Sequence, residues 1–251
     1  MNTSQIKAHK LFVDNLCKSF EEVSVLKDVS LKLDENEFVS ILGPSGSGKS
    51  TIFNIISGLV IPDGGTYFID GEESIGKLGM VSYMHQKDLL LPWKKIIDNL
   101  TLPLIIKGID KNTAKEEAVK HLSTFGLEGF ENKYPFQLSG GMKQRAALLR
   151  AYLFSGNIML LDEPFGALDA ITRSKMHYWL LNVVKNLKTT VLFITHDIEE
   201  AILLSDRIYV LSDRPAIVKD EIIVEFMGER NREFITSPEF NQIKKRILNE
   251  L

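Results

Sequence analysis

Residues 37–59 read EFVSILGPSGSGKSTIFNIISGL, and this stretch decides the fold. Residues 38–42 are an apolar run typical of a buried strand, and the glycine-rich segment 43–51 separates them from an apolar-periodic segment that stops at Gly58. A strand, a glycine-rich loop and a helix in this order are the context in which a G-x-x-x-x-G-K-S motif binds phosphate. The sequence therefore predicts a nucleotide-binding core around this loop.

The residue types of the loop suit a polyphosphate. Its glycines let consecutive backbone N–H groups point into one concavity, and the helix that begins near Lys49 adds the positive end of its dipole. Lys49 would reach the β- and γ-phosphates, and the Ser50 hydroxyl would be a ligand of Mg²⁺. The residues expected around the nucleotide are Gly43, Pro44, Ser45, Gly46, Ser47, Gly48, Lys49, Ser50 and Thr51. The alternative is a glycine-rich turn with an accidental Lys-Ser pair.

Composition bounds the class of protein. The chain has 251 residues, which can bury one large α/β core or a core with a smaller subdomain. Its 30 basic and 33 acidic residues give a net charge of −3, which does not suggest a general nucleic-acid binder. The single Cys17 fits a reducing compartment. With no signal-type N-terminus and no run approaching 18 apolar residues, we expect a cytosolic protein that meets a membrane only through a partner.

Alternating strand and helix patterns predict a mostly parallel sheet. Strands are expected at residues 10–20, 26–33, 38–42, 66–69, 79–84, 157–161 and 190–195, with Phe20 in the loop after the first. Turn signals around 66–69 indicate an antiparallel β edge, whereas the helical pattern at 171–187 implies parallel strands with right-handed crossovers. Since such sheets bind ligands beyond the carboxyl ends of their strands, residues 43–51, 162–163 and 196 should converge.

One region interrupts the alternation. Between 87 and 150 strand patterns give way to helical ones: Asn112 or Thr113 can cap a helix that ends by Gly126, and a second helix follows Gly141. We predict fold class α/β, a P-loop NTPase core with a mostly parallel sheet, an antiparallel β edge and an inserted α-helical subdomain. The expected bounds within this one domain are about 1–86 and 155–225 for the core, 87–154 for the helical subdomain and 226–251 for a C-terminal tail.

Residues 158–163 read IMLLDE, an apolar strand pattern that ends in two adjacent carboxylates. In an extended chain neighbouring side chains point to opposite sides, so one acid can face a metal ion and the other the far side of the phosphate. We expect Asp162 on the metal side and Glu163 as the base that orients or deprotonates the attacking water. The alternative is a solvated strand end that carries two acids.

Residues 138–145 read LSGGMKQR, a serine and two glycines that open a helix. This is a second anion-binding geometry, and one polyphosphate does not need two such sites from one molecule. Together with the phosphate loop, the Asp-Glu strand end and His196 in this order, the segment resembles the ATP-binding-cassette family, whose signature is LSGGxxQR. The resemblance covers about residues 10–225.

The resemblance implies ATP and Mg²⁺ as ligands and a pair of cassettes, either a homodimer or two different chains, facing head to tail. In that arrangement Ser139, Gly140 and Gly141 of one cassette close on the γ-phosphate held by the phosphate loop of the other. Residues 167–169, ALD, resemble the family's D-loop and would place Asp169 across the dimer near the opposite phosphate loop.

Three further residues take family roles by resemblance. Gln86 matches the Q-loop glutamine, which touches Mg²⁺ or the attacking water and links to the membrane partner. His196 matches the switch histidine, which contacts the γ-phosphate and Glu163. Phe20 stands where a tyrosine usually stacks on adenine, so it is either an adenine platform or a residue that packs in the sheet. The other four histidines have no such support: His9, His85, His121 and His177.

Short motifs indicate the branch of the family. Residues 89–93, LLLPW, followed by Asp98-Asn99 resemble a segment of importer ATPases for nitrate, alkyl sulfonates and taurine, as do SDRPA at 212–216 and THDIEEA at 195–201. This implies a peripheral subunit on the cytoplasmic face of the cell membrane, with an integral-membrane permease docked just after Gln86. An extracytoplasmic solute-binding protein would act indirectly, and no nucleic acid is expected.

The competing class is a soluble cassette ATPase that acts on nucleic acid or ribosomes. Such proteins usually carry two cassettes in one chain or a coiled-coil insertion, and the sequence shows neither pattern. A kinase or GTPase would leave residues 138–145 without a role. Two departures from the family pattern, Asn36 before Glu37 and His85 where an aromatic residue is frequent, do not touch the expected catalytic groups.

Overall fold

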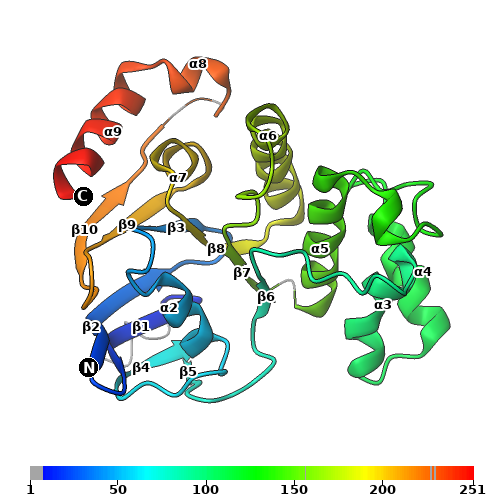
Figure 1. Cartoon of the computed structure of the whole chain (residues 1–251), viewed down its shortest axis with the longest axis horizontal. Coiled ribbons are helices and arrows are strands. Elements are labelled where there is room, and N and C mark those ends of the chain that lie inside the picture. The colour runs from blue at the N-terminus through cyan, green and yellow to red at the C-terminus, as the bar shows by residue number, and fades with distance from the viewer. Residues whose placement is uncertain (1–7, 156, 227, 229) are drawn as a thin grey trace.

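The structure is a computed structural model that describes residues 8–155, 157–226, 228 and 230–251. Figure 1 shows two sheets, a group of helices at one end and a C-terminal helical segment. The strands are β1 (Leu11–Phe20), β2 (Val23–Leu33), β3 (Phe38–Leu42), β4 (Gly64–Ile69), β5 (Glu72–Glu73), β6 (Ser82–Met84), β7 (Ile158–Asp162), β8 (Thr190–Thr195), β9 (Arg207–Leu211) and β10 (Val218–Ile223). The helices are α2 (Lys49–Ile56), α3 (Ile96–Ile106), α4 (Lys111–His121), the 3₁₀ turn η1 (Pro135–Gln137), α5 (Gly140–Phe154), α6 (Ala170–Leu187), α7 (Ile198–Leu204), α8 (Arg232–Ile235) and α9 (Pro238–Glu250).

The larger sheet has the strand order β10-β9-β3-β8-β7-β6. Its pairs are parallel except for β10 with β9, so the predicted mostly parallel sheet is confirmed. Every residue of β3 and β8 is buried, which explains their continuous apolar pattern. Ile41 and Leu192 face the core cluster that holds α2, whereas Phe38 and Phe193 face the cluster that holds α5 and α6.

The smaller sheet is antiparallel, in the order β2-β1-β4-β5, and supplies the predicted β edge. Phe20 is the last residue of β1 and pairs with Val23, so its expected place in a loop is wrong: the turn is Glu21–Glu22. Val23 is exposed, so the start of β2 lacks the alternation of buried apolar and exposed polar residues that indicates a strand. The sequence pattern for β2 is therefore recognisable only from Leu26. The side chains of α2 share one core cluster with residues of both sheets.

Four helical segments, α3, α4, η1 and α5, lie between β6 and β7 (Figure 1). The helix α4 is capped by Asp110, whose Oδ2 accepts from the Thr113 backbone N–H at 2.9 Å, so the predicted cap at Asn112 or Thr113 is wrong. An N-cap side chain reaches the N–H two or three residues ahead, which selects Asp110. The helix α5 begins at Gly140, two residues earlier than predicted, with Ser139 as its cap.

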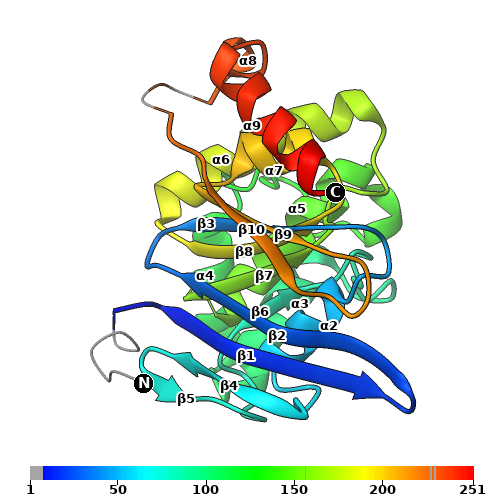
Figure 2. The same ribbon diagram turned by 90° about the vertical axis from the view of Figure 1, so that its left-hand side faces the viewer.

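The expected C-terminal tail, 226–251, contains α8 and α9, and β10 precedes it; the sequence analysis assigned no structure to these three elements. Phe240 and Ile247 of α9 are buried in one cluster with Ala201 and Ile202 of α7. Figure 2 shows α9 lying across the end of the molecule beside α7 and β10. None of the helices in the described ranges is long and apolar enough to cross a membrane.

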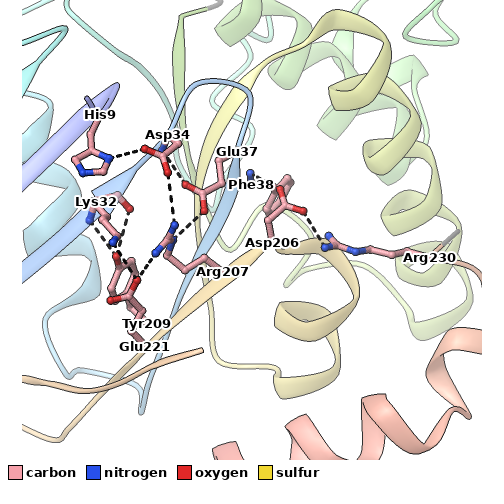
Figure 3. Close-up of polar contacts among 10 residues, drawn as sticks. All are labelled: His9, Lys32, Asp34, Glu37, Phe38, Asp206, Arg207, Tyr209, Glu221 and Arg230. Atoms are coloured by element: carbon pink, nitrogen blue, oxygen red, sulfur yellow. Dashed lines mark hydrogen bonds and ion pairs between the residues drawn. The ribbon is translucent and has the colours of Figure 1, made fainter. Parts of the chain in front are cut away.

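A network of charges ties the two sheets together where β2 ends and β3 begins (Figure 3). The Arg207 guanidinium at the start of β9 donates to Glu37 Oε1 at 2.8 Å and to Glu221 of β10, and lies 3.6 Å from Asp34. The Tyr209 hydroxyl accepts from the Lys32 backbone N–H at 3.1 Å. These contacts fix the amino end of β3 and leave its carboxyl end to carry the phosphate loop.

Candidate active site

The glycine-rich loop joins β3 to α2 and can hold phosphate. At Gly48 φ is +117°, and a Cβ there would lie 2.9 Å from both Val25 and Leu26 side chains, so only glycine fits. No side chain caps α2, which leaves its N-terminal N–H groups for a ligand. The Ser47 hydroxyl is buried without a hydrogen-bond partner among the described residues, an orphaned donor in the same loop.

Lys49 is held by the loop itself. Its ammonium donates to the carbonyl oxygens of Gly43 at 2.8 Å and Pro44 at 2.7 Å, and the residue is only 5% exposed. Burial lowers the Lys49 pKa, and the nearby carboxylates Glu163 and Asp162 oppose that shift. A buried cation on a phosphate loop therefore stands close to two acids from another strand.

Asp162, the last residue of β7, lies beside α2. Its Oδ2 accepts from the Ser50 hydroxyl at 3.0 Å and from the Tyr83 hydroxyl at 3.2 Å. Burial raises the Asp162 pKa, and the two hydroxyl donors act in the opposite direction. Carboxylate and hydroxyl oxygens are the ligands that Mg²⁺ prefers, so the Ser50–Asp162 pair fits such an ion.

Glu163 lies at the centre of three strand ends. Its Oε1 is 3.0 Å from Nδ1 of His196, after β8, and its Oε2 accepts from Nε2 of Gln86, after β6, at 3.3 Å. Its backbone N–H donates to the Ile194 carbonyl at 3.0 Å. Its φ of +43° is a left-handed conformation that is unfavourable for glutamate. Neighbours that hold a carboxylate in a strained backbone are typical of functional sites.

Behind the switch histidine lies a buried network that sequence reasoning missed. Glu200 of α7 contacts the His177 ring at 2.7 Å through Oε1 and accepts from the Thr195 hydroxyl through Oε2. The Thr195 hydroxyl also accepts from the Asp197 backbone N–H at 3.0 Å. The chain on both sides of His196 is thereby anchored to α6. The sequence feature that could have indicated this network is Glu200, a carboxylate within the apolar pattern of a short helix.

The signature and D-loop residues lie elsewhere. Figure 1 shows α5, which begins at Gly140, across β6 and β7 from α2, which begins at Lys49. The signature segment and the phosphate loop therefore belong to helices on different parts of the molecule. Ser139 Oγ accepts from the Met142 N–H at 3.3 Å. A Cβ on Gly140 would approach Leu168 to 3.2 Å, and one on Gly141 would approach Thr172 to 3.3 Å, so the glycines allow close packing against the D-loop and the first turn of α6.

Asp169, at the start of α6, and Phe20, at the end of β1, are both exposed. Asp169 caps α6 by accepting from the Thr172 N–H at 3.0 Å, and its hydrogen bonds with Thr172 lower its pKa. The Phe20 ring is 47% exposed, with the Lys18 ammonium 5.3 Å from its centroid. An exposed aromatic face at a hairpin end is free to stack on a flat ligand and does not fill the sheet core.

The two departures from the family pattern have structural explanations. Asn36 adopts φ +61°, a conformation that Asn tolerates, and its N–H donates to the Thr190 hydroxyl at 2.9 Å. The His85 ring stacks on Tyr83, with centroids 4.0 Å apart and 26° between the planes. The imidazole thus supplies a flat ring at this position.

Comparisons with known proteins agree with this architecture. The family model described as ABC transporter matches residues 26–166. The formylaminopyrimidine import ATP-binding protein ThiZ of Halalkalibacterium halodurans is 49% identical over 205 residues, which are 78% of this chain and 80% of the relative. The aliphatic sulfonates import ATP-binding protein SsuB of Bacillus cereus is 39% identical over 242 residues, 95% and 94% of the two chains.

The fold has solved counterparts. The dimeric structure of MJ0796, a bacterial ABC transporter cassette, superposes with a TM-score of 0.73 at 34% identity and covers 86% of this chain and 100% of its own. A second structure of the same cassette is a post-hydrolysis dimer bound to ADP and phosphate. The resemblance predicted from the motifs is confirmed: the chain belongs to the ABC transporter family and is one of its ATP-hydrolysing cassettes.

Proposed function

We propose that this chain is the ATP-hydrolysing subunit of a membrane importer for a small solute, working as a head-to-tail pair of cassettes. The observation that carries the proposal is the convergence of Gln86, Glu163 and His196 beside the phosphate loop. Relatives are named for import of aliphatic sulfonates, taurine and formylaminopyrimidine. We propose a nitrate-, sulfonate- or taurine-like solute for this chain.

In this mechanism the chain binds the triphosphate through the loop N–H groups and the Lys49 ammonium. Ser50, Asp162 and the Gln86 amide oxygen would hold Mg²⁺, since all three offer oxygen ligands. When bound, Mg²⁺ neutralises charge on the phosphate oxygens. Glu163 accepts the proton of the attacking water, and His196, whose side chain is 55% exposed, holds Glu163 with one ring nitrogen and leaves the other for the γ-phosphate.

The signature segment would complete the site of a partner cassette. Ser139 and Gly140 are exposed at the start of α5, an uncovered helix N-terminus that favours an anion. The phosphate loop of the same chain lies on another part of the molecule, so we propose that the anion comes from a second cassette, either a copy of this chain or a paired one. Phe20 would stack on the adenine, and Asp169 would lie near the opposite phosphate loop.

A groove beside the Q-loop segment suits a permease helix. It has a volume of about 380 Å³ and lies between residues 78–89, α3 and α5. Its rim exposes apolar side chains, with Leu59 61%, Leu78 68% and Ile106 73% exposed. An apolar groove of this kind can take the face of an amphipathic helix. We propose that a permease docks here and along residues 86–99, with this chain on the cytoplasmic face of the membrane.

The buried Asn99 shapes the adjoining loop. Its side chain accepts from the Leu91 N–H at 2.7 Å and donates to the carbonyls of Leu91, Lys94 and Lys95. The loop that carries Trp93 is therefore held in one conformation, with the indole 71% exposed. A permease would dock on this preorganised surface, and the extracytoplasmic solute-binding protein would act only on the permease. We expect no nucleic-acid partner.

The test is co-expression with the permease that the neighbouring genes are expected to encode. The proposal expects the two to copurify and phosphate release from ATP to rise in the complex, without an acceptor substrate. Failure to copurify, together with phosphate release stimulated by RNA or ribosomes, would instead support a soluble cassette.

A further inference from the structure

Tyr83 of β6 connects to the metal side of the site in a way that the family motifs do not describe. Its hydroxyl donates to Asp162 Oδ2 at 3.2 Å, the same oxygen that accepts from Ser50 at 3.0 Å. If the Ser50 hydroxyl turns to a metal ion, Tyr83 is the donor that still orients this carboxylate oxygen.

The Tyr83 ring is fixed by aromatic contacts on two sides. Phe53 of α2 packs edge-on, with centroids 5.7 Å apart and planes at 85°, and His85 stacks on it at 4.0 Å. Tyr83 and His85 both line the 380 Å³ groove. One rigid aromatic pair therefore reaches from the groove wall to the carboxylate beside the phosphate loop.

We propose that Tyr83 is a positioning residue for Asp162, and that the Tyr83–His85 stack transmits occupancy of the groove to the metal side of the ATP site. The second statement rests on the proposed docking of a permease. At 3.2 Å the hydroxyl contact is longer than the usual range for an O–H···O bond. A docked helix that moves the His85 ring by a few tenths of an ångström would therefore either tighten or break the bond.

The first test uses the isolated chain, loaded with a nonhydrolysable ATP analogue, and measures Mn²⁺ binding by electron paramagnetic resonance. Tyr83→Phe keeps the ring and its stack and removes only the hydroxyl. We expect the Kd for Mn²⁺ to rise about 10-fold, the lower end for losing a residue that orients a metal ligand. Analogue binding without metal should not change. A Kd for Mn²⁺ equal to that of the wild type, or tighter, would overturn the positioning role.

The matched control is Tyr209→Phe, which deletes a buried tyrosine hydroxyl that contacts the Lys32 backbone at the other side of the sheet (Figure 3). It should cost comparable stability and leave the Kd for Mn²⁺ unchanged. If both substitutions weaken Mn²⁺ binding equally, the effect is general loosening of the fold, and Tyr83 has no special role.

The second test uses the complex with the permease and substitutes His85. His85→Ala removes the stack and should lower the ratio of permease-stimulated to basal phosphate release at least threefold while copurification persists. His85→Phe restores a flat ring and should restore the ratio. An unchanged ratio in His85→Ala would refute transmission through the stack. If the wild type itself fails to copurify, the docking proposal and the transmission both fall, whereas the Mn²⁺ measurement still decides the role of Tyr83.

Discussion

At the scale of single residues, Glu163 is held between Gln86 and His196 by contacts of 3.3 and 3.0 Å, on a backbone with φ +43°. A carboxylate held by two neighbours in an unfavourable backbone conformation is preorganised. Gln86 and His196 are exposed, while the Glu163 side chain between them is 18% exposed.

Glu163→Gln keeps the shape and removes the base. We expect phosphate release to fall at least 100-fold, since general-base catalysis contributes about 10²–10⁴-fold. Binding of a fluorescent ATP analogue should stay within a few-fold of the wild type because Lys49 is untouched. Turnover within tenfold of the wild type would assign the base to another residue.

The raised pKa of Asp162 predicts that the stability of the metal-free chain depends on pH. Because burial raises its pKa above 3.8, the folded state binds the proton more tightly than the unfolded state, so the metal-free chain loses stability as pH rises through that range. Asp162→Asn removes this cost. We expect its Tm without metal to exceed that of the wild type at pH 7, with the difference shrinking towards pH 4. A lower Tm for Asp162→Asn at pH 7 would contradict this sign.

Trp93 could either fill the core of the helical subdomain or anchor a partner helix, and the structure distinguishes these two roles. Truncation of an indole buried in the helical subdomain would cost about 3–5 kcal/mol of stability. Trp93, however, is 71% exposed. The free energy of unfolding of Trp93→Ala should therefore lie within about 0.5 kcal/mol of the wild-type value, as expected for a surface substitution. The variant should also lose copurification with the permease and keep basal phosphate release. Early melting would instead make Trp93 a core residue.

At the scale of elements, β8 and α7 hold the switch histidine through Glu200, which is 7% exposed. Glu200→Leu leaves His177 and Thr195 buried without their partner, at a cost of about 1–3 kcal/mol for each group. We expect Tm to fall by roughly 4–24 °C, since 1 kcal/mol is about 2–4 °C at this size. Phosphate release should fall as well. The neighbouring Glu199→Gln, which loses only a surface pair with Lys244, is the control and should change Tm little.

The elements also show how far the sequence could be taken. The phosphate loop, β8 and the Asp-Glu strand end were predictable because glycine spacing and continuous apolar runs depend on local chemistry. Phe20 was misplaced because hairpin register depends on the partner strand, which no local pattern reveals. His177 was dismissed for the same reason: its partner Glu200 is 23 residues away, and only the packing of α6 on α7 brings the two together. The tail stayed unassigned because α9 is stabilised by contacts with α7.

At the scale of the whole molecule, the signature segment and the phosphate loop of one chain lie apart, and one relative, the cassette MJ0796, has been solved as a dimer. Two copies placed head to tail would bring each signature to the other's nucleotide. Ser139→Arg should then leave ATP-analogue binding at Lys49 within a few-fold of the wild type and block phosphate release, because the damage lies in the partner's site. Equal loss of binding and turnover would indicate a site completed within one chain.

The measurement that tests the composite site most directly is sedimentation velocity of Glu163→Gln with Mg-ATP, because this variant should keep the nucleotide that holds two cassettes together. The account predicts a monomer without nucleotide, a dimer with Mg-ATP, and a monomer again when Ser139→Arg is added. Monomers alone, in a sample shown to have bound ATP, or a dimer indifferent to Ser139→Arg, would contradict it.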